Sequence, residues 1–294
     1  MEAINKGASA GVDRVTTEEY AKDLGKHIVE VVDSLKGKRY RAKLVRRVNI
    51  PKGDGKTRPL GIPAVSDKLV QMAVAWILMA IYEQDFMGCS YGYRPRVGAK
   101  DAVRDLTKEL QFERYNYVVE ADIKGYFDSI NHEWLLKMLE ERIDDRSFIG
   151  LIRKWLKAGI LETDGKVNHP EMGTPQGGVV SPVLANIYLH YALDMWFEKV
   201  VKPRCEGAAY LCRYADDFVC AFQNKKDAER FYRALKERLG KFSLEVSEEK
   251  TNIIPFSRYP RKRRPGLSFS VLSFGGVSRG KGKISSNEGP HGRS

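Results

Sequence analysis

The stretch that decides the fold is AAYLCRYADDFVCAF, residues 208–222. Its two halves alternate in the two-residue period of a β-strand and meet at Ala215, Asp216 and Asp217. The pattern predicts a β-hairpin with acid at its tip. Aspartate is a common turn residue, so an isolated pair is usually only a turn. Here apolar strands flank the pair directly, which favours a functional site.

A second acidic strand end lies upstream. Residues 117–122 (YVVEAD) read as a β-branched strand ending at Asp122, and the glycine-containing turn KGYFD follows. Packing Asp122, Asp216 and Asp217 together would raise at least one carboxyl pKa unless a cation neutralises them. Carboxylate oxygens select Mg²⁺, which completes its shell with water and substrate phosphates. Two such ions could activate an attacking hydroxyl and stabilise a leaving pyrophosphate.

Composition points to a polyanionic partner. The 294 residues carry a formal charge of +12, and 43% of them are apolar, enough for a sizeable core in one large domain or two intimate ones. The charge is local, since seven basic residues face one aspartate over 41–60 (+6) and nine face one glutamate over 251–294 (+8). The rest is slightly acidic. A local basic excess of this kind favours nucleic acid.

Residues 172–193 have no Lys, Arg, Asp or Glu, which raises the question of a membrane span. Prolines and glycines interrupt the run, so we expect no membrane partner. The opening MEAINKGASAG lacks the apolar segment of a secretory signal, and the four cysteines form no CxxC pair. We therefore expect a cytoplasmic protein with reduced thiols.

The remaining pattern predicts helices and short strands. Residues 17–35 read as one helix, 44–50 with the turn PKGDGK as a basic hairpin, and Ser66 as the cap of an apolar helix ending near Tyr82. Further helices are expected after Asn131, over 148–157 and over 183–199. Asp227 reads as the cap of a helix that stops at Gly240, and 244–246 and 252–256 read as strands.

Several motifs together resemble the group II intron-encoded reverse transcriptases. They are YADD (214–217), ADIKGYFDSINH (121–132), GTPQGGVVSPVLANIYL (173–189), IPKGDGKTRPLGIPAVSDKLVQ (50–71), SYGYRP (90–95) and NKGASAGVD (5–13). They occur in the family's order from about residue 5 to about residue 276. The resemblance implies an α+β right-hand polymerase fold, with an antiparallel palm sheet backed by helices. Residues 1–115 would be the fingers with a remnant of an N-terminal extension, and 116–276 the palm with a fingers-like insertion at about 132–172. Residues 277–294 would be a disordered basic tail.

The resemblance also implies catalytic roles. Asp122 and Asp216 would ligate both of two Mg²⁺ ions, for which Mn²⁺ could substitute. Asp217 would be the third acid, and Ile123 is included among the metal-binding residues. Lys250, in SEEKT, matches a lysine that protonates the departing pyrophosphate, although lysine in a polar turn needs no special explanation.

Nucleotide contacts follow in the same way. Phe127 matches the bulky residue beneath the sugar, where a 2′-hydroxyl would clash, and an ordinary core aromatic is the alternative. Gln176 and Gly177 would contact the nucleotide or template edge, unless GTPQGG is a plain loop-to-helix junction. The expected triphosphate contacts are the backbone of Ile123, Lys124, Gly125 and Tyr126, and the side chains of Arg58 and either Lys52 or Lys56. Each of these cations could instead be a solvated surface residue.

The expected nucleic-acid contacts are Arg46 and Arg47 in the basic hairpin, Arg94 in SYGYRP, and Phe274 and Gly275 at the primer grip. Arg94 would contact the template backbone or brace the fingers. The primer-grip match is imperfect, because SFGG at 273–276 stands where the family shows FLG.

The leading hypothesis is an RNA-directed DNA polymerase that adds dNTPs to a DNA or RNA primer, with intron RNA as template and as partner in splicing and retrohoming. One alternative is a maturase-like module that binds intron RNA without efficient synthesis, against which the acidic triad argues. Another is a reverse transcriptase recruited to host defence or CRISPR adaptation. The family's thumb, maturase and endonuclease segments do not fit after residue 276, so we expect weak primer-template retention. The sequence sets no expectation for oligomeric state.

Overall fold

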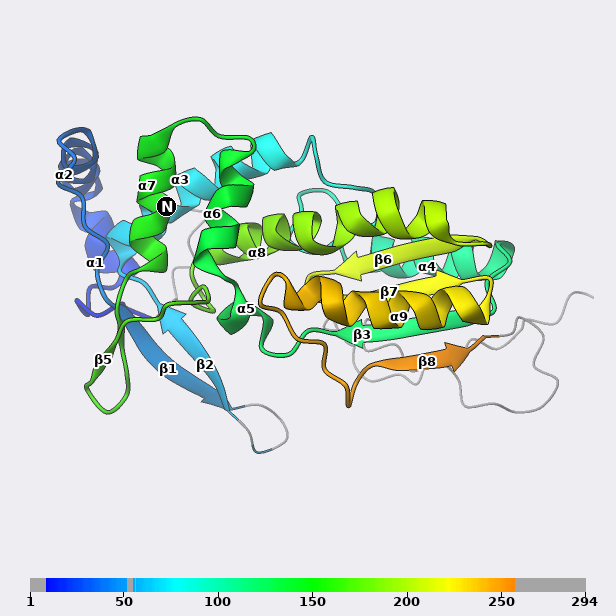
Figure 1. Cartoon of the computed structure of the whole chain (residues 1–294). Coiled ribbons are helices and arrows are strands. Elements are labelled where there is room, and N and C mark those ends of the chain that lie inside the picture. Colours follow the sequence, from blue (N-terminus) through cyan, green and yellow to red (C-terminus); the bar gives the residue numbers. More distant parts are fainter. Residues whose placement is uncertain (1–8, 52–54, 56, 257–294) are drawn as a thin grey trace, which may run out of the picture.

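The protein is described by a computed structural model that covers residues 9–51, 55 and 57–256 (Figure 1). These residues form two four-stranded sheets and a set of helices, which is the predicted α+β class. One sheet has the strand order β2-β1-β4-β5 and the other β6-β7-β3-β8. The predicted tail, residues 277–294, lies outside the described residues.

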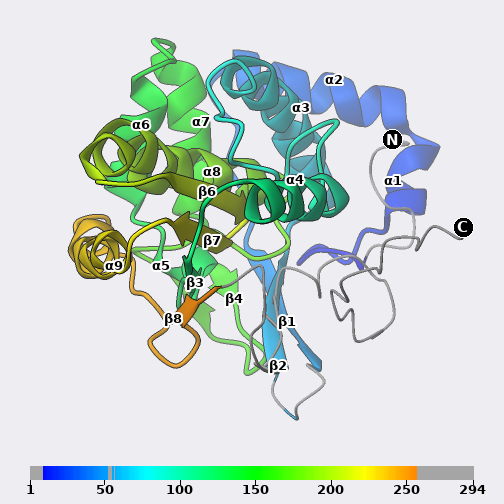
Figure 2. The same cartoon turned by 90° about the vertical axis from the view of Figure 1, so that its right-hand side faces the viewer.

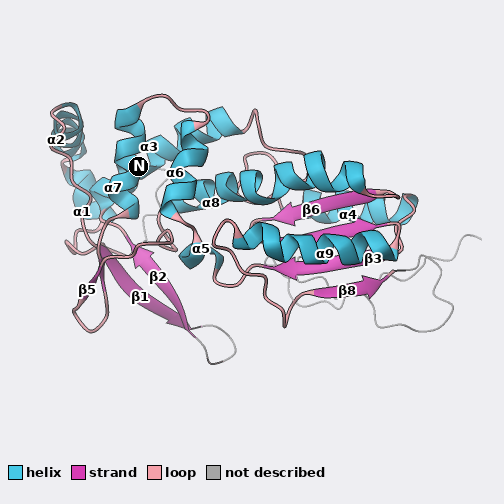
Figure 3. Ribbon diagram, in the orientation of Figure 1, coloured by secondary structure: helices cyan, strands magenta, loops and turns pink. Residues whose placement is uncertain are grey.

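The second sheet contains the motif that decides the fold. Its strands are β6 (Ala209–Tyr214), β7 (Asp217–Phe222), β3 (Tyr117–Asp122) and β8 (Asn252–Pro255), all paired antiparallel. Figure 3 shows α8 (Ser181–Leu189) and α9 (Lys225–Gly240) across one face. Figure 2 shows α4 (Ala99–Phe112) on the other face. All six residues of β7 are therefore buried, which explains the unbroken apolar run after Asp217.

Two apolar clusters hold this sheet between its helices. Leu106 and Leu110 of α4 share one cluster with Val118 and Val219 of the strands. On the opposite face, a larger cluster joins Phe231 of α9 to the sheet and extends through α3, α6 and α8. The sheet is thus a central layer, and its strand ends hold a fixed position relative to the helices.

The other sheet is built on the basic hairpin. Strands β1 (Val45–Pro51) and β2 (Thr57–Ile62) pair antiparallel, as the sequence predicted, and project away from the helices (Figure 1). Strand β4 (Ile160–Leu161) pairs parallel with β1 and antiparallel with β5 (Val167–Asn168). The insertion predicted at 132–172 therefore contributes strands to the hairpin's sheet.

Helices α3 (Val65–Tyr82), α6 (His132–Glu140) and α7 (Arg146–Leu156) lie above the β1–β2 hairpin in the view of Figure 1. Of the described helices, α3 has the length and composition of a membrane span, and half of it is buried. Its Asp67 accepts hydrogen bonds from the Tyr40 hydroxyl and the Lys43 amide. These contacts are those of a core helix.

Several local predictions are wrong in detail. The helix expected over 17–35 is divided into α1 (Thr17–Lys22) and α2 (Leu24–Lys36), with the break at Asp23. Ser66 does not cap α3, because the helix begins at Val65 after Ala64. Asp227 does not cap α9, which begins at Lys225; its buried carboxylate instead binds the Gly207 amide and Arg230. Both polar residues resembled caps in sequence but lie inside the first turn.

Two further differences concern length. The helix expected over 183–199 is α8 followed by two wider π-helical turns, η1 (His190–Asp194) and η2 (Phe197–Val201). A short, tighter 3-10 helix, η3 (Lys202–Arg204), comes after them. The strand expected at 244–246 is reduced to one bridge between Val246 and Ile123. The four cysteines are free thiols, as expected.

Candidate active site

The two acidic strand ends meet because of the sheet register. Strands β3 and β7 pair antiparallel, and this pairing places Asp122 directly opposite Asp217. Directly opposed residues on neighbouring strands have side chains close together. Asp216 precedes Asp217 in the turn that joins β6 to β7. The structure therefore brings together the three carboxylates that the sequence predicted.

The turn from Tyr214 to Asp217, here called the catalytic turn, has an unusual backbone. Ala215 has a φ of 56°, in the left-handed region that residues other than glycine rarely adopt. Gly92 lies directly against it, since a Cβ on Gly92 would be 2.3 Å from the Ala215 nitrogen. The position of Asp216 therefore depends on a strained residue held by a neighbouring segment.

Two of these carboxylates, Asp216 and Asp217, are destabilised as anions. Partial burial, followed by the charges of Asp216 and Asp122, raises the pKa of Asp217 to about 7. Burial, with a smaller contribution from Asp122, also raises the pKa of Asp216. A cation is already near, because Lys250 Nζ donates to Asp122 Oδ2 at 2.7 Å. This hydrogen bond raises the pKa of Lys250.

The donor set fits a hard divalent cation. A divalent cation would neutralise the excess negative charge at the two strand ends. Carboxylate oxygens are also the protein ligands that such a cation prefers. Among the described residues, no group of three or more acidic, histidine or cysteine side chains is placed to hold a metal ion by itself. Mg²⁺ commonly takes one or two protein carboxylates and keeps water or substrate phosphate for its other positions. Ile123 follows Asp122 and forms a backbone bridge with Val246.

Phe127 lies in the short helix α5 (Tyr126–Ser129), five residues after Asp122. Gly125, with a φ of 55°, caps the start of this helix, and Lys124 is exposed and ion-paired with Glu245. Tyr126 is buried, and its hydroxyl donates to the Ala185 carbonyl. Phe127 is half-buried, so it is partly accessible while α5 holds its backbone.

The GTPQGG loop, residues 173–178, packs between α5 and β2. The Gly173 and Thr174 amides donate to the Ile130 and Phe127 carbonyls, and the Gly61 amide donates to the Gln176 carbonyl. Gly177 has a φ of 104°, and a Cβ there would be 2.7 Å from the Gly61 carbonyl oxygen. The loop thus links the hairpin to the backbone of Phe127. Glycine at position 177 makes this possible, because it tolerates a positive φ and leaves room for the close contact with Gly61.

Of the basic side chains expected to bind the triphosphate, the structure describes only Arg58. Arg58 is exposed on β2, and its charge acts on Asp216 and on the hydroxyl of Tyr93. Arg58 therefore lies near the carboxylates. Lys52 and Lys56 lie outside the described residues, as do Phe274 and Gly275.

The three arginines expected at nucleic acid have partners within the protein. Arg46 donates twice to the Ala10 carbonyl, and Arg47 pairs with Glu162 at 3.3 Å. Arg94 donates to Glu83 and to the Met87 and Ser90 carbonyls. For Arg94 this geometry favours bracing the fingers over contacting template.

Sequence reasoning missed Arg213, on β6 immediately before the catalytic turn. Its side chain is fully buried, and all five of its N–H donors have partners. They bind Asp194, Asn186, the Ser90 hydroxyl and the Ala215 carbonyl. A lone arginine in the apolar run AAYLCRY was the signal that could have revealed it.

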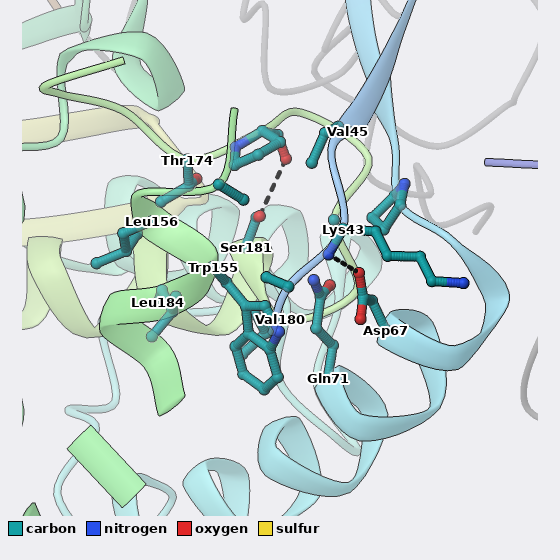
Figure 4. A pocket seen from close by; sticks show the side chains of 15 residues that line it. Lys43, Val45, Asp67, Gln71, Trp155, Leu156, Thr174, Val180, Ser181 and Leu184 are labelled. Atoms are coloured by element: carbon teal, nitrogen blue, oxygen red, sulfur yellow. Dashed lines mark hydrogen bonds between the residues drawn. The ribbon is translucent and has the colours of Figure 1, made fainter. Parts of the chain in front are cut away.

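A small cavity lies behind the GTPQGG loop (Figure 4). Its volume is about 20 Å³, room for a single water molecule. Thr174 lines it, and the Thr174 hydroxyl has no partner in the described structure. The Lys43–Asp67 and Ser181–Pro175 hydrogen bonds lie at its edge (Figure 4). The cavity is far too small for a nucleotide, so it belongs to the packing of the loop.

Comparison with known proteins agrees with this geometry. The family model described as "Reverse transcriptase (RNA-dependent DNA polymerase)" matches residues 50–266. Protein YkfC of Escherichia coli is 34% identical, over 85% of this chain and 73% of that protein. Group II intron-encoded protein LtrA of Lactococcus lactis is 36% identical, over 95% of this chain but only 55% of that protein. The chain therefore spans about half of the length of LtrA.

Solved structures show the same fold at low sequence identity. Telomerase from Candida albicans, in complex with a fragment of telomeric RNA, aligns over 86% of this chain and 47% of that chain, with a TM-score of 0.61 and 14% identity. Apo telomerase from Candida tropicalis aligns with a TM-score of 0.54 at 16% identity, over 84% of this chain and 52% of that one.

Proposed function

The chain belongs to the reverse transcriptase (RNA-dependent DNA polymerase) family, and on that basis we propose that it copies RNA into DNA by adding dNTPs to a primer 3′-hydroxyl. The single observation that supports this most is the register that sets Asp122 opposite Asp217, beside Asp216. An RNA-binding module gains nothing from three carboxylates at a surface that must meet phosphates.

The family uses divalent metal ions, and we propose two Mg²⁺ ions here. Asp122, Asp216 and Asp217 would hold them, and Mn²⁺ could replace them. When bound, the ions would lower the pKa of the primer hydroxyl and stabilise charge on the leaving pyrophosphate. The raised pKa of Asp217, about 7, supports this role because a bound cation would restore its charged form.

Side chains of the protein would bind the triphosphate, donate a proton to the leaving pyrophosphate and select the sugar. Arg58 would donate to the triphosphate through its guanidinium fork. Lys250, now paired with Asp122, is a candidate proton donor to pyrophosphate. Phe127 would exclude the ribose 2′-hydroxyl, since it is half-buried and its ring meets Tyr93, on whose hydroxyl the charge of Asp216 acts.

The proposal is tested by dNTP incorporation with Mg²⁺, comparing wild type with Asp216→Asn. This variant keeps the shape of the side chain and removes its charge. We expect a loss of at least about a hundredfold in kcat. Glu229→Gln, an exposed glutamate on α9 paired with Lys225, is the matched control and should leave the rate unchanged.

Two primed templates give the experiment its second readout, poly(rA)/oligo(dT) and a group II intron RNA. We propose intron RNA as the natural partner, because the relative LtrA is named as a group II intron-encoded protein and the hairpin is basic. Higher kcat/KM on the intron RNA would support this partner, and equal values would contradict it. Equal incorporation by wild type and Asp216→Asn would refute the catalytic assignment.

A further inference from the structure

Tyr93, in the SYGYRP segment, lies beside the ring that would contact the nucleotide sugar. We infer that Tyr93 is a specificity-determining positioning residue, which holds the Phe127 ring in place and so sets how strongly ribonucleotides are excluded. The inference rests on the proposed function, because only a polymerase can show this selectivity. Nothing in the sequence pattern set Tyr93 apart from its neighbours.

The two rings meet edge to face. Their centroids are 6.4 Å apart and their planes lie at 78°, a geometry that aromatic pairs favour. The other aromatic neighbour of Phe127 in the described structure is Tyr126, at 5.6 Å and 61°. Tyr126 is buried and anchored through its hydroxyl to Ala185. One contact of Phe127 is thus part of the core, and the other depends on Tyr93.

The backbone of Tyr93 is held in a conformation that costs energy. Its φ is 56°, which is a true outlier for a bulky side chain. Such residues persist only where their surroundings fix them, and they gather at functional sites. The strain therefore points to a required position for this ring.

Both neighbours of Tyr93 supply that constraint. The Gly92 carbonyl accepts from Asn186 Nδ2 at 3.0 Å, and the Gly92 Cα packs against Ala215 of the catalytic turn. Arg94 donates to the Ser90 carbonyl at 2.7 Å and to Glu83. The same short segment thus contacts both the turn that carries Asp216 and the Phe127 ring, which would lie against the nucleotide sugar.

Exposure separates Tyr93 from an ordinary core aromatic. The residue is 44% exposed, so shortening its side chain would open space beside Phe127 and would not leave a closed core cavity. Phe127, itself half-buried, would then be free to move toward that space. A nucleotide with a ribose 2′-hydroxyl would then be excluded less strongly, while a deoxyribonucleotide would be accepted as before.

The test measures kcat/KM for a dNTP and for the matching rNTP on poly(rA)/oligo(dT). For Tyr93→Ala we expect the dNTP preference to fall about three- to tenfold, the value of one aromatic contact. Tyr93→Phe keeps the ring edge and removes only the hydroxyl, so its preference should match wild type. Phe127→Ala is the positive control and should show the largest fall.

The outcomes distinguish the inference from the proposal beneath it. A relaxed preference in Tyr93→Ala with a normal one in Tyr93→Phe supports the positioning role. If Tyr93→Ala loses activity on both nucleotides equally, or if Tyr93→Phe relaxes as much as Tyr93→Ala, the role is overturned while the polymerase remains. A wild-type protein that incorporates neither nucleotide overturns the proposed function, and the role of Tyr93 with it.

Discussion

Arg213 shows how one buried charge can organise a site without touching the reaction. Its guanidinium binds Asp194 of the turn after α8, Ser90 of the fingers segment and the carbonyl of Ala215. Main-chain bonds reinforce the contact, since the Arg213 amide donates to Cys89 and its carbonyl accepts from Tyr91. The strained catalytic turn is thus tied to two distant parts of the chain at once, the segment around Ser90 and the turn that carries Asp194.

At this scale we predict that Arg213→Met lowers the free energy of unfolding by about 3–5 kcal/mol, because it leaves Asp194 as an unpaired buried charge. The double variant Arg213→Met/Asp194→Leu should recover much of that loss, since apolar residues can replace a buried ion pair. Urea unfolding measures both. Both variants should still incorporate dNTPs poorly, because neither has a donor for the Ala215 carbonyl. A double variant as unstable as the single one, or one with full activity, would contradict this account.

At the scale of elements, the GTPQGG loop acts as a spacer between hairpin and palm. Gly173 has a φ of 88°, and a Cβ there would be 2.9 Å from the backbone of Asp128. We predict that Gly173→Ala destabilises the protein and lowers kcat/KM for dNTPs, because the loop must move away from α5 and the Phe127 carbonyl.

Gly165 offers a matched control for this prediction. Its φ is 85°, but nothing lies within 4 Å of where its Cβ would be. Gly165→Ala therefore carries only the strain of the left-handed backbone, about 1 kcal/mol. Gly173→Ala should cost at least about 1 kcal/mol more, in unfolding experiments on both variants. Equal losses would mean that the loop does not press on α5.

For the whole molecule, two buried histidines predict sensitivity to acid. Burial lowers the pKa of His190, whose Nδ1 has no partner in the described structure, and also that of His132, which contacts the Gly173 carbonyl. The unfolded chain takes up protons near pH 6.5 and the folded protein only at lower pH, so stability falls as the pH drops below about 6.5. Each histidine contributes at most about 1.4 kcal/mol per pH unit.

Urea unfolding at pH 7.5 and pH 5.0 tests this dependence. His190→Leu removes one titrating group, so this variant should lose less stability between the two pH values than wild type. His169, which is exposed, provides the control, and His169→Leu should retain the wild-type dependence. The same loss in His190→Leu as in wild type would show that other groups cause the acid sensitivity.

Much of the fold was predictable because its signals are local. The bounds of β3 and the hairpin of β1 and β2 followed from alternation and turn residues, and Asn131 does cap α6. The caps at Ser66 and Asp227 were wrong because short polar residues serve equally well inside a first turn, where a tertiary partner such as the Gly207 amide decides. Arg46 and Arg47 looked like free cations because their partners, Ala10 and Glu162, lie far away in sequence.

The sequence by itself determined which residues could do chemistry: an acidic hairpin tip, an acidic strand end, a basic hairpin and a bulky aromatic after Asp122. Tertiary structure alone decided how they meet. The β3–β7 register sets Asp122 opposite Asp217, and packing puts Lys250 on Asp122, Arg213 on Ala215 and Tyr93 against Phe127. The physical reason is that periodicity fixes which way a side chain points within its own element. Its partner depends on how distant elements pair and pack, and no local pattern contains that information.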